Sequence, residues 1–225
     1  GIKPGDEVIT APNSFIATSA ATVRFGAKPI FVDVCDDQNI NAELIENVIT
    51  EKTKAILPVY LTGRIAKMNK IIDIGKKYNI PVIEDAAQAI GSLYYNKPSG
   101  SFGKVGCFST HPLKNLNSCG DGGFLTTNDK NIYVKAEILR SHGLVSRDVS
   151  VEFGFVSRMD SIQAAILNYR LMKLDDVISK RRENAKYYLN NLNDQHIKLP
   201  IDKKHEFNTY HTFVIQTDKR DALRQ

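Results

Sequence analysis

Short apolar runs alternate with segments of helical period through the first half of the chain. Runs rich in β-branched residues predict strands, and apolar positions that recur every three or four residues predict helices. The expected strands are residues 7–10, 29–34, 53–60 and 81–87, and the expected helices are 14–26, 43–50 and 68–79. Strands that alternate with helices indicate βαβ units and a mainly parallel sheet.

The pattern changes after Gly100. Two strand-like runs, 105–110 and 122–127, are close in sequence and are joined through a segment that contains Lys114. A helix is expected next, at residues 131–143, and a long polar helical stretch then runs from Met159 to about Asn193. Residues 210–217 are expected to open a further strand.

These elements predict an α/β protein with two parts. Residues 1–158 are expected to form a large domain with a mainly parallel central sheet flanked by helices. Residues 159–225 are expected to supply a bridging helix and the beginning of a small C-terminal α+β domain. The first residues, GIKPGDEVIT, are typical of the middle of a domain, and the last, DKRDALRQ, of the first turns of a helix. We therefore expect both ends to be truncated.

Composition excludes several classes of protein. The 225 residues are 42% hydrophobic, which is enough for a globular core. The 30 basic and 25 acidic residues are interspersed, which favours a solvated surface over a nucleic-acid interface. Three cysteines without CxxC spacing predict neither disulfides nor a metal site, and they indicate a cytoplasmic protein. No apolar run approaches the length of a membrane span.

Chemically active side chains follow three of the predicted strands. Asp85 and Gln88 follow one strand, Ser109 and Lys114 follow another, and Phe15 follows the first. Ligands of open α/β sheets bind at the carboxyl ends of the strands, so these side chains are candidates for one pocket.

A lysine and a carboxylate in one pocket are the groups that pyridoxal phosphate requires. An amine forms a Schiff base with its aldehyde, and a carboxylate keeps its pyridine nitrogen protonated. A hydroxyl would hold the phosphate, and a flat apolar side chain would stack on the ring. Each residue also has an ordinary role, as a surface lysine, a strand-end cap, a turn hydroxyl or a core aromatic. The residues alone leave this cofactor as one option among several.

Two motifs in combination are more specific. EDAAQ occupies residues 84–88, and HPLKNL with GDGG lies within 111–123. Further matching segments, RSHG and RMDSIQAAI, follow in the same order. On these motifs the chain resembles the DegT/StrS family of sugar aminotransferases, which are pyridoxal phosphate enzymes of fold type I. The resemblance covers nearly the whole chain.

The resemblance implies a role for each candidate residue. Lys114 would be the catalytic Schiff-base lysine, and Asp85 would contact the pyridine nitrogen. Gln88 would lie beside the ring and its phenolic oxygen. Ser109 would bind the phosphate, and Phe15 would take the place of the stacking aromatic. The glycines of the GDGG motif would permit the tight turn after the lysine.

The implied reaction converts a nucleotide-linked keto sugar to an amino sugar in a homodimer, with an amino acid, usually glutamate, as donor. Surface polysaccharide and secondary-metabolite pathways use such sugars. A sugar dehydrase of the same fold is one alternative, although such enzymes resemble this chain with His in place of the lysine. A truncated, non-catalytic member is the other alternative.

Two departures from the family pattern bear on the cofactor. The glycine-threonine segment that binds the phosphate in the family would lie before Gly1. Val156 stands where the family commonly has an Asn that reaches the cofactor phosphate of the partner subunit, and valine has no donor to offer. From these two differences we expect this chain to retain the cofactor weakly.

Overall fold

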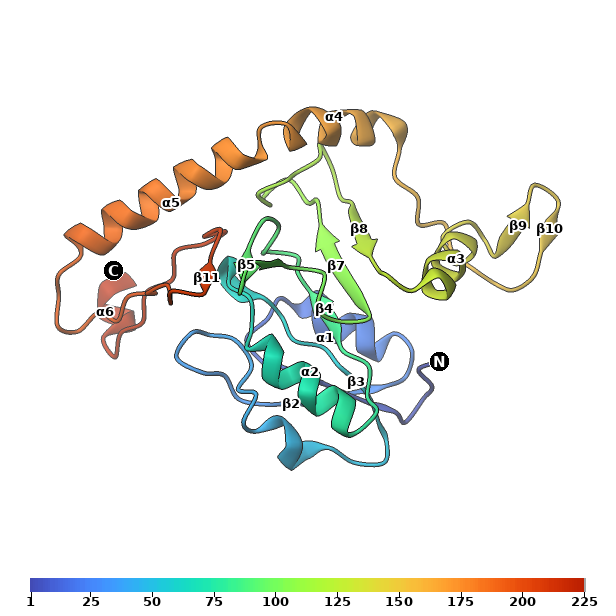
Figure 1. Cartoon of the computed structure of the whole chain (residues 1–225), viewed down its shortest axis with the longest axis horizontal. Helices are drawn as coiled ribbons and strands as arrows, with labels where there is room; N and C mark the ends of the chain where they lie inside the picture. The colour runs from blue at the N-terminus through green and yellow to red at the C-terminus, as the bar shows by residue number, and fades with distance from the viewer. Residues whose placement is uncertain (225) are drawn as a thin grey trace.

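Parallel strands form the centre of the fold (Figure 1). The computed structural model describes residues 1–224. Strand β1 (Glu7–Thr10) lies between β2 (Lys28–Phe31) and β3 (Thr53–Ile56) and is parallel to both. Strand β4 (Ile83–Asp85) is parallel to β7 (Val105–Ser109).

Backbone hydrogen bonds join these two groups of strands into one sheet. The amide of Ile56 donates to the carbonyl of Pro81 at 3.0 Å, and the amide of Asp85 donates to the carbonyl of Pro58 at 3.0 Å. The resulting order is β2-β1-β3-β4-β7-β8, in which β8 (Gly123–Thr126) alone is antiparallel to its neighbour. The predicted α/β fold with a mainly parallel sheet is confirmed.

Helix α2 (Met68–Lys77) shows how the sequence positions a helix on this sheet. Its Met68, Ile71 and Ile74 lie on one face and pack into the core with the strand residues Ile9 and Ile56. Lysines in its last turn interact favourably with the negative end of the helix dipole and so stabilise the helix. Helix α1 (Ile16–Val23), which connects β1 to β2, ends before Gly26 as the sequence predicts.

Three expected elements differ in the structure. Residues 43–50 form only the short 3₁₀ helix η1 (Ile45–Val48). Side chains three apart eclipse in a 3₁₀ helix, so both Ile45 and Val48 face the core in a single turn. The expected strand at 210–217 is absent except for one bridge between Lys198 and Gln216. The positive φ of 47° at Tyr210 interrupts the extended conformation there.

The long helix expected from Met159 to Asn193 is two helices. Helix α4 (Ser161–Leu171) and helix α5 (Leu174–Asn191) are separated at residues 172–173, and the chain changes direction there (Figure 1). Leu167 of α4 and Leu174 of α5 pack in one cluster with Leu116. The break lets both helices contact that cluster.

The remaining elements are short. Asp129 caps helix α3 by accepting the amide hydrogen of Asn131 at 2.9 Å. None of the helices in the described part of the chain is long and apolar enough to cross a bilayer. The elements not yet named are η2 (Leu61–Gly63), β5 (Leu93–Tyr94), β6 (Lys97–Pro98), α3 (Lys130–Leu139), β9 (Leu144–Ser146), β10 (Val149–Ser150), β11 (Glu206–Phe207) and α6 (Arg220–Arg224).

The division at residue 158 stays a prediction. Strand β11 of the C-terminal part pairs with β5, which pairs with β6. The C-terminal residues therefore add to a small sheet begun by residues 93–98.

A buried carboxylate fixes the middle of the large sheet. Glu84 in β4 is fully buried, and its Oε2 accepts hydrogen bonds from the Tyr60 hydroxyl at 2.6 Å and the Gly100 amide at 2.7 Å. Its Oε1 accepts from the amides of Phe102 at 2.7 Å and Gly103 at 2.6 Å. Four donors converge on one side chain, so the loop between β6 and β7 is held to β4.

We predict that Glu84→Gln destabilises the protein. The new amide nitrogen would face backbone N–H donors, and each donor left unsatisfied costs about 1–3 kcal/mol. Chemical denaturation should show a lower free energy of unfolding than in wild type. The exposed Glu51→Gln is the matched control and should change it by less than about 0.5 kcal/mol. Equal stability of the two variants would contradict the anchoring role.

Candidate active site

Asp85 is held at the carboxyl end of β4, next in sequence to the anchor Glu84. Side chains alternate along a strand, so the two carboxylates face opposite sides of the sheet. The Thr18 hydroxyl donates to Asp85 Oδ2 at 2.8 Å, and the Ala87 amide donates to Oδ1 at 3.2 Å. Thr18 is a buried residue of α1, so this helix fixes the orientation of the carboxylate.

Lys114 lies in the loop between β7 and β8, which we call the lysine loop (residues 110–122). Its amide donates to the His111 carbonyl at 2.8 Å, and the next residues, Asn115 and Leu116, are buried. The Lys114 side chain is half-buried. Burial lowers the pKa of its amine, and the negative charge of Asp85 opposes that shift. The amine and the carboxylate therefore lie close enough to interact across the ends of β4 and β7.

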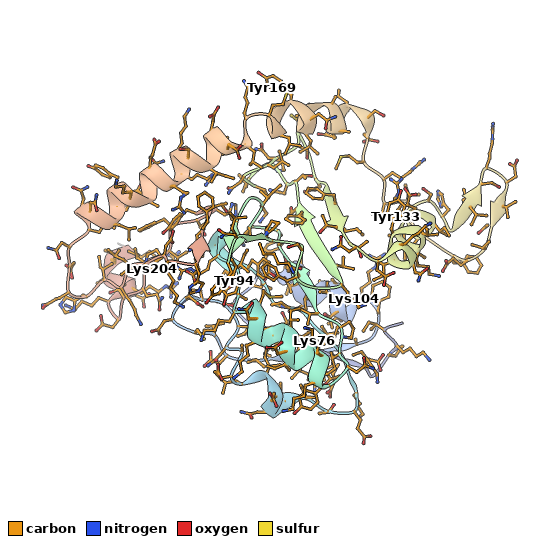
Figure 2. The ribbon with its side chains drawn as sticks, in the orientation of Figure 1. Lys76, Tyr94, Lys104, Tyr133, Tyr169 and Lys204 are labelled. Carbon is orange, nitrogen blue, oxygen red and sulfur yellow. The ribbon has the colours of Figure 1, made fainter. Side chains whose placement is uncertain are left out.

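Helix α4 holds the lysine loop from outside. Arg170 donates to the Asn117 carbonyl at 2.7 Å, and the Gln163 side chain accepts the Cys119 amide hydrogen at 2.8 Å. Leu167 of the same helix packs against Leu116. Tyr169 points away from the body of the protein (Figure 2). The face of α4 opposite Tyr169 therefore fixes the backbone on both sides of Asn117.

The other three candidates lie at or after the ends of strands β7, β4 and β1. Ser109 ends β7, and its hydroxyl accepts the His111 amide hydrogen at 3.2 Å. Gln88 follows β4, and its side-chain oxygen accepts the Thr62 amide hydrogen at 2.8 Å. Phe15 precedes α1 with 73% of its surface exposed. The loop side of the sheet thus has an amine, a carboxylate, a hydroxyl, an amide and an exposed aromatic ring.

This set of groups fits pyridoxal phosphate. The carboxylate ends β4, the amine lies in the loop that follows the adjacent strand β7, and the amine is partly withdrawn from water. The turn after the lysine needs glycine, because a Cβ on Gly123 would lie 2.5 Å from the Phe108 carbonyl oxygen. A Cβ on Gly122 would lie 2.7 Å from Thr110 Oγ1. The glycines therefore allow the close packing that holds the lysine loop.

Several residues of the site carry no clear signal in the sequence. Thr18 lies three residues after Phe15, and a small hydroxyl residue on a helix gives no indication of its bond to Asp85. In the sequence, Arg170 is indistinguishable from the other charged residues of a polar helix. His211 lies 96 positions from Asn115, yet its Nδ1 is 3.4 Å from Asn115 Oδ1. Only the tertiary fold brings these residues to the site.

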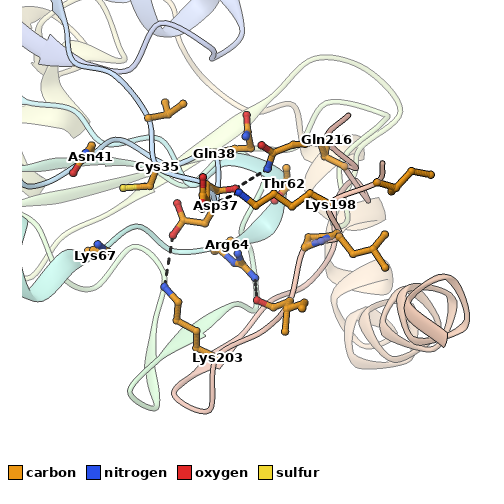
Figure 3. A pocket seen from close by; sticks show the side chains of 17 residues that line it. Cys35, Asp37, Gln38, Asn41, Thr62, Arg64, Lys67, Lys198, Lys203 and Gln216 are labelled. Atoms are coloured by element: carbon orange, nitrogen blue, oxygen red, sulfur yellow. Dashed lines mark hydrogen bonds and ion pairs between the residues drawn. The ribbon is translucent and has the colours of Figure 1, made fainter. Parts of the chain in front are cut away.

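A separate cavity of about 920 Å³ lies between the segment after β2 and the C-terminal part (Figure 3). Its charged groups bind one another: Lys198 Nζ is 2.8 Å from Asp36 Oδ2, and Lys203 Nζ is 4.0 Å from Asp37 Oδ2. None of the five candidate residues lines it.

The sequence matches a known protein family over its whole length. The DegT/DnrJ/EryC1/StrS aminotransferase family matches residues 1–225. The chain belongs to this family.

Curated relatives extend beyond the matched region. A pleiotropic regulatory protein of Geobacillus stearothermophilus is 40% identical over 100% of this chain and 61% of its own length. The UDP-N-acetyl-3-dehydro-alpha-D-glucosamine 3-aminotransferase of Acidithiobacillus ferrooxidans is 41% identical over 99% of this chain and 61% of its own length. The chain therefore spans less than two thirds of these relatives.

Solved structures agree in fold. DesV of Streptomyces venezuelae, in complex with a ketimine intermediate, has a TM-score of 0.95 and 36% identity, covering 100% of this chain and 61% of DesV. NtdA of Bacillus subtilis, with bound cofactor PMP, has a TM-score of 0.90 and 34% identity, covering 100% of this chain and 52% of NtdA. The predicted fold of a pyridoxal phosphate transferase is thus confirmed.

The opposing effects on Lys114 give a prediction that needs no cofactor. Asp85→Asn removes the negative charge that raises the pKa of the Lys114 amine, so the pKa should fall below its wild-type value. Acetylation of cofactor-free protein at a series of pH values, followed by mass spectrometry of each lysine, measures this. The exposed Lys104, which lies 4.0 Å from Asp129, should titrate identically in both proteins. An unchanged Lys114 midpoint would show that the charge of Asp85 does not affect the amine.

Proposed function

We propose that this protein is a pyridoxal phosphate-dependent aminotransferase that converts a nucleotide-linked keto sugar to an amino sugar. The observation that carries the proposal is the half-buried Lys114 amine, whose charge Asp85 favours, in the loop that follows the strand next to Asp85. Family membership supports it, because aminotransferases of this family use this cofactor.

Each side chain of the site has one role in holding the cofactor. Lys114 would bind its aldehyde carbon, and Asp85 would accept a hydrogen bond from its pyridinium nitrogen. Ser109 would donate to its phosphate, and Phe15 would cover the ring. The oxygen of Gln88 is engaged by Thr62, so the NH₂ group of Gln88 is the part that would face the phenolic oxygen.

The cofactor, when bound, supplies an electrophilic carbon and a conjugated ring that withdraws electrons from the amino donor. Lys114 Nζ would take the proton from the α-carbon of the donor and return it during amino transfer. A base must be neutral to accept a proton, and burial lowers the pKa of this amine in the required direction. Asp85, oriented by the hydrogen bond from the Thr18 hydroxyl, would accept a hydrogen bond from the ring nitrogen and so favour its protonated form.

The names of relatives support the class of substrate. The Acidithiobacillus relative is named for amination of a dehydro sugar on UDP, at 41% identity. We propose a nucleotide-linked keto sugar as acceptor and an amino acid, glutamate, as donor, in the synthesis of surface polysaccharides or secondary metabolites. The Geobacillus relative bears a regulatory name, but Lys114 and Asp85 are both present in this chain and support catalysis. A dehydrase is disfavoured because the lysine is retained.

We also propose that the protein acts as a homodimer. The hairpin β9–β10 and the residues after it project from the body of the protein (Figure 1). Exposed apolar side chains gather on this segment: Val145, Val149, Val151, Phe153, Phe155 and Val156. Such a surface is typical of an interface, and two-fold pairing of identical chains is the commonest way to cover it.

We predict that Lys114→Ala abolishes covalent attachment of pyridoxal phosphate and lowers amino transfer by ~10²–10⁴-fold. The lysine loop is held by its backbone and by α4, so the thermal unfolding midpoint should stay near that of wild type. Borohydride reduction followed by mass spectrometry locates the attachment, and product formation gives the rate. Lys104→Ala is the control and should behave as wild type. Attachment to another lysine in the Lys114→Ala protein would overturn the assignment.

We predict that Phe153→Asp weakens self-association. Phe153 is 101% exposed, so a charge there should not disturb the fold of one chain but would be desolvated in a dimer. Light scattering over a range of protein concentrations should show dissociation at concentrations where wild type is dimeric. Tyr187→Asp, at an exposed position of α5, is the matched control and should leave the dimer intact. Equal effects of the two variants would place the interface elsewhere.

A further inference from the structure

The C-terminal part of the chain contacts the turns that support the site. Residues 60–64 form the turn whose Thr62 amide binds Gln88. Arg64 in this turn is buried and donates to the Ile201 carbonyl at 2.6 Å. The Thr209 amide donates to the Gly63 carbonyl at 3.2 Å. One side of the site is therefore held by residues 201–211, which we call the C-terminal segment.

His211 ends this segment against the lysine loop. Its Nδ1 lies 3.4 Å from Oδ1 of Asn115, the residue after Lys114. These two side chains are within hydrogen-bonding distance, and the tautomer of the ring sets which of them donates. Asn115 is 7% exposed, which leaves its side chain little room to move independently of His211.

The backbone at His211 is fixed from two further directions. Arg181 of α5 donates to the carbonyl oxygens of Tyr210 at 3.4 Å and His211 at 2.9 Å. A Cβ on Gly63 would lie 3.0 Å from the His211 amide nitrogen, so the segment packs closely on the turn that supports Gln88. The position of the imidazole is therefore set by α5 and by this turn.

The charged groups facing His211 are both cations. Burial, Lys114 and Arg181, in that order of size, lower the pKa of the His211 imidazole to about 4. The ring is therefore neutral at neutral pH. Asp85 is the charge that raises the pKa of Lys114, against the effect of burial. A protonated imidazole at this place would add a third cation to Lys114 and Arg181.

We propose that His211 is a positioning residue that acts on Lys114 through Asn115, as a hydrogen-bonding partner supplied by the C-terminal segment. The proposal rests on the proposed function, in which Lys114 is the reacting amine. It assigns two properties to His211. Its contact with Asn115 keeps the lysine loop in one place. Because the ring is neutral, burial and Asp85 alone set the pKa of the Lys114 amine.

The first property is tested by a pair of variants. His211→Leu removes the hydrogen-bonding group, whereas His211→Asn keeps a polar group that can bond to the Asn115 side chain. The rate at which Lys114 captures pyridoxal phosphate, measured by borohydride trapping, should fall by roughly tenfold to a hundredfold in His211→Leu, because small displacements of a reacting group are costly. His211→Asn should recover most of that rate.

Asn115→Leu should resemble His211→Leu, and the double variant should be no slower than either single variant, because the two residues act as one contact. Thermal unfolding of every variant identifies any that fails to fold, in which case the Asn115 variants carry the test. Equal capture rates in His211→Leu and His211→Asn, or additive effects in the double variant, would overturn the positioning role.

The second property is tested without cofactor. His211→Lys places a permanent cation beside the amine and should lower the acetylation midpoint of Lys114, while His211→Asn should leave it at the wild-type value. An unchanged midpoint in His211→Lys would overturn the claim that neutrality matters. These readouts also separate the two proposals. If His211→Lys shifts the acetylation midpoint of Lys114 but the wild-type protein transfers no amino group, only the proposed function is wrong. If His211→Leu captures the cofactor at the wild-type rate, only this inference is wrong.

Discussion

The burial of Glu84 is the constraint on which the site depends. A carboxylate without water is tolerated only when its oxygens are fully hydrogen-bonded, and four donors meet this one. The chain must therefore bring Tyr60 and the loop at 100–103 to β4. Burial and the charge of Glu84 raise the pKa of Tyr60 well above its usual value, so its hydroxyl remains a donor. With Glu84 fixed inward, strand alternation leaves Asp85 facing the site.

Lys114 is controlled differently, through its backbone. The β7–β8 pairing, α4 and the C-terminal segment each fix part of the lysine loop. The hydrogen bonds and ion pairs of the described residues leave its Nζ without a partner, although Asp85 acts on its charge. This arrangement suits an amine that must form and break a covalent bond. The backbone holds the amine in place, so Nζ has no hydrogen bond of its own to break before it reacts.

The positions of the candidate residues relative to the strands could be predicted from local sequence pattern. Asp85, Gln88, Ser109 and Lys114 follow strands whose apolar runs are clear, and their motifs have fixed spacing. The errors arose where distant contacts decide the local conformation. The break between α4 and α5 follows from packing both helices on Leu116, and the Tyr210 and His211 carbonyls are bound by Arg181 instead of by a strand partner. No periodicity within either segment reveals these contacts.

The C-terminal segment connects these two kinds of control. Its Thr209 and its Ile201 carbonyl bind the turn that positions Gln88, and its His211 contacts the loop that carries Lys114. The turn includes Thr62 at a φ of 63°, a conformation that costs energy in a β-branched residue and persists only where surrounding contacts enforce it. The segment supplies several of those contacts. A residue far from the sheet in sequence can therefore alter both sides of the site, because the strained turn and the lysine loop share one support.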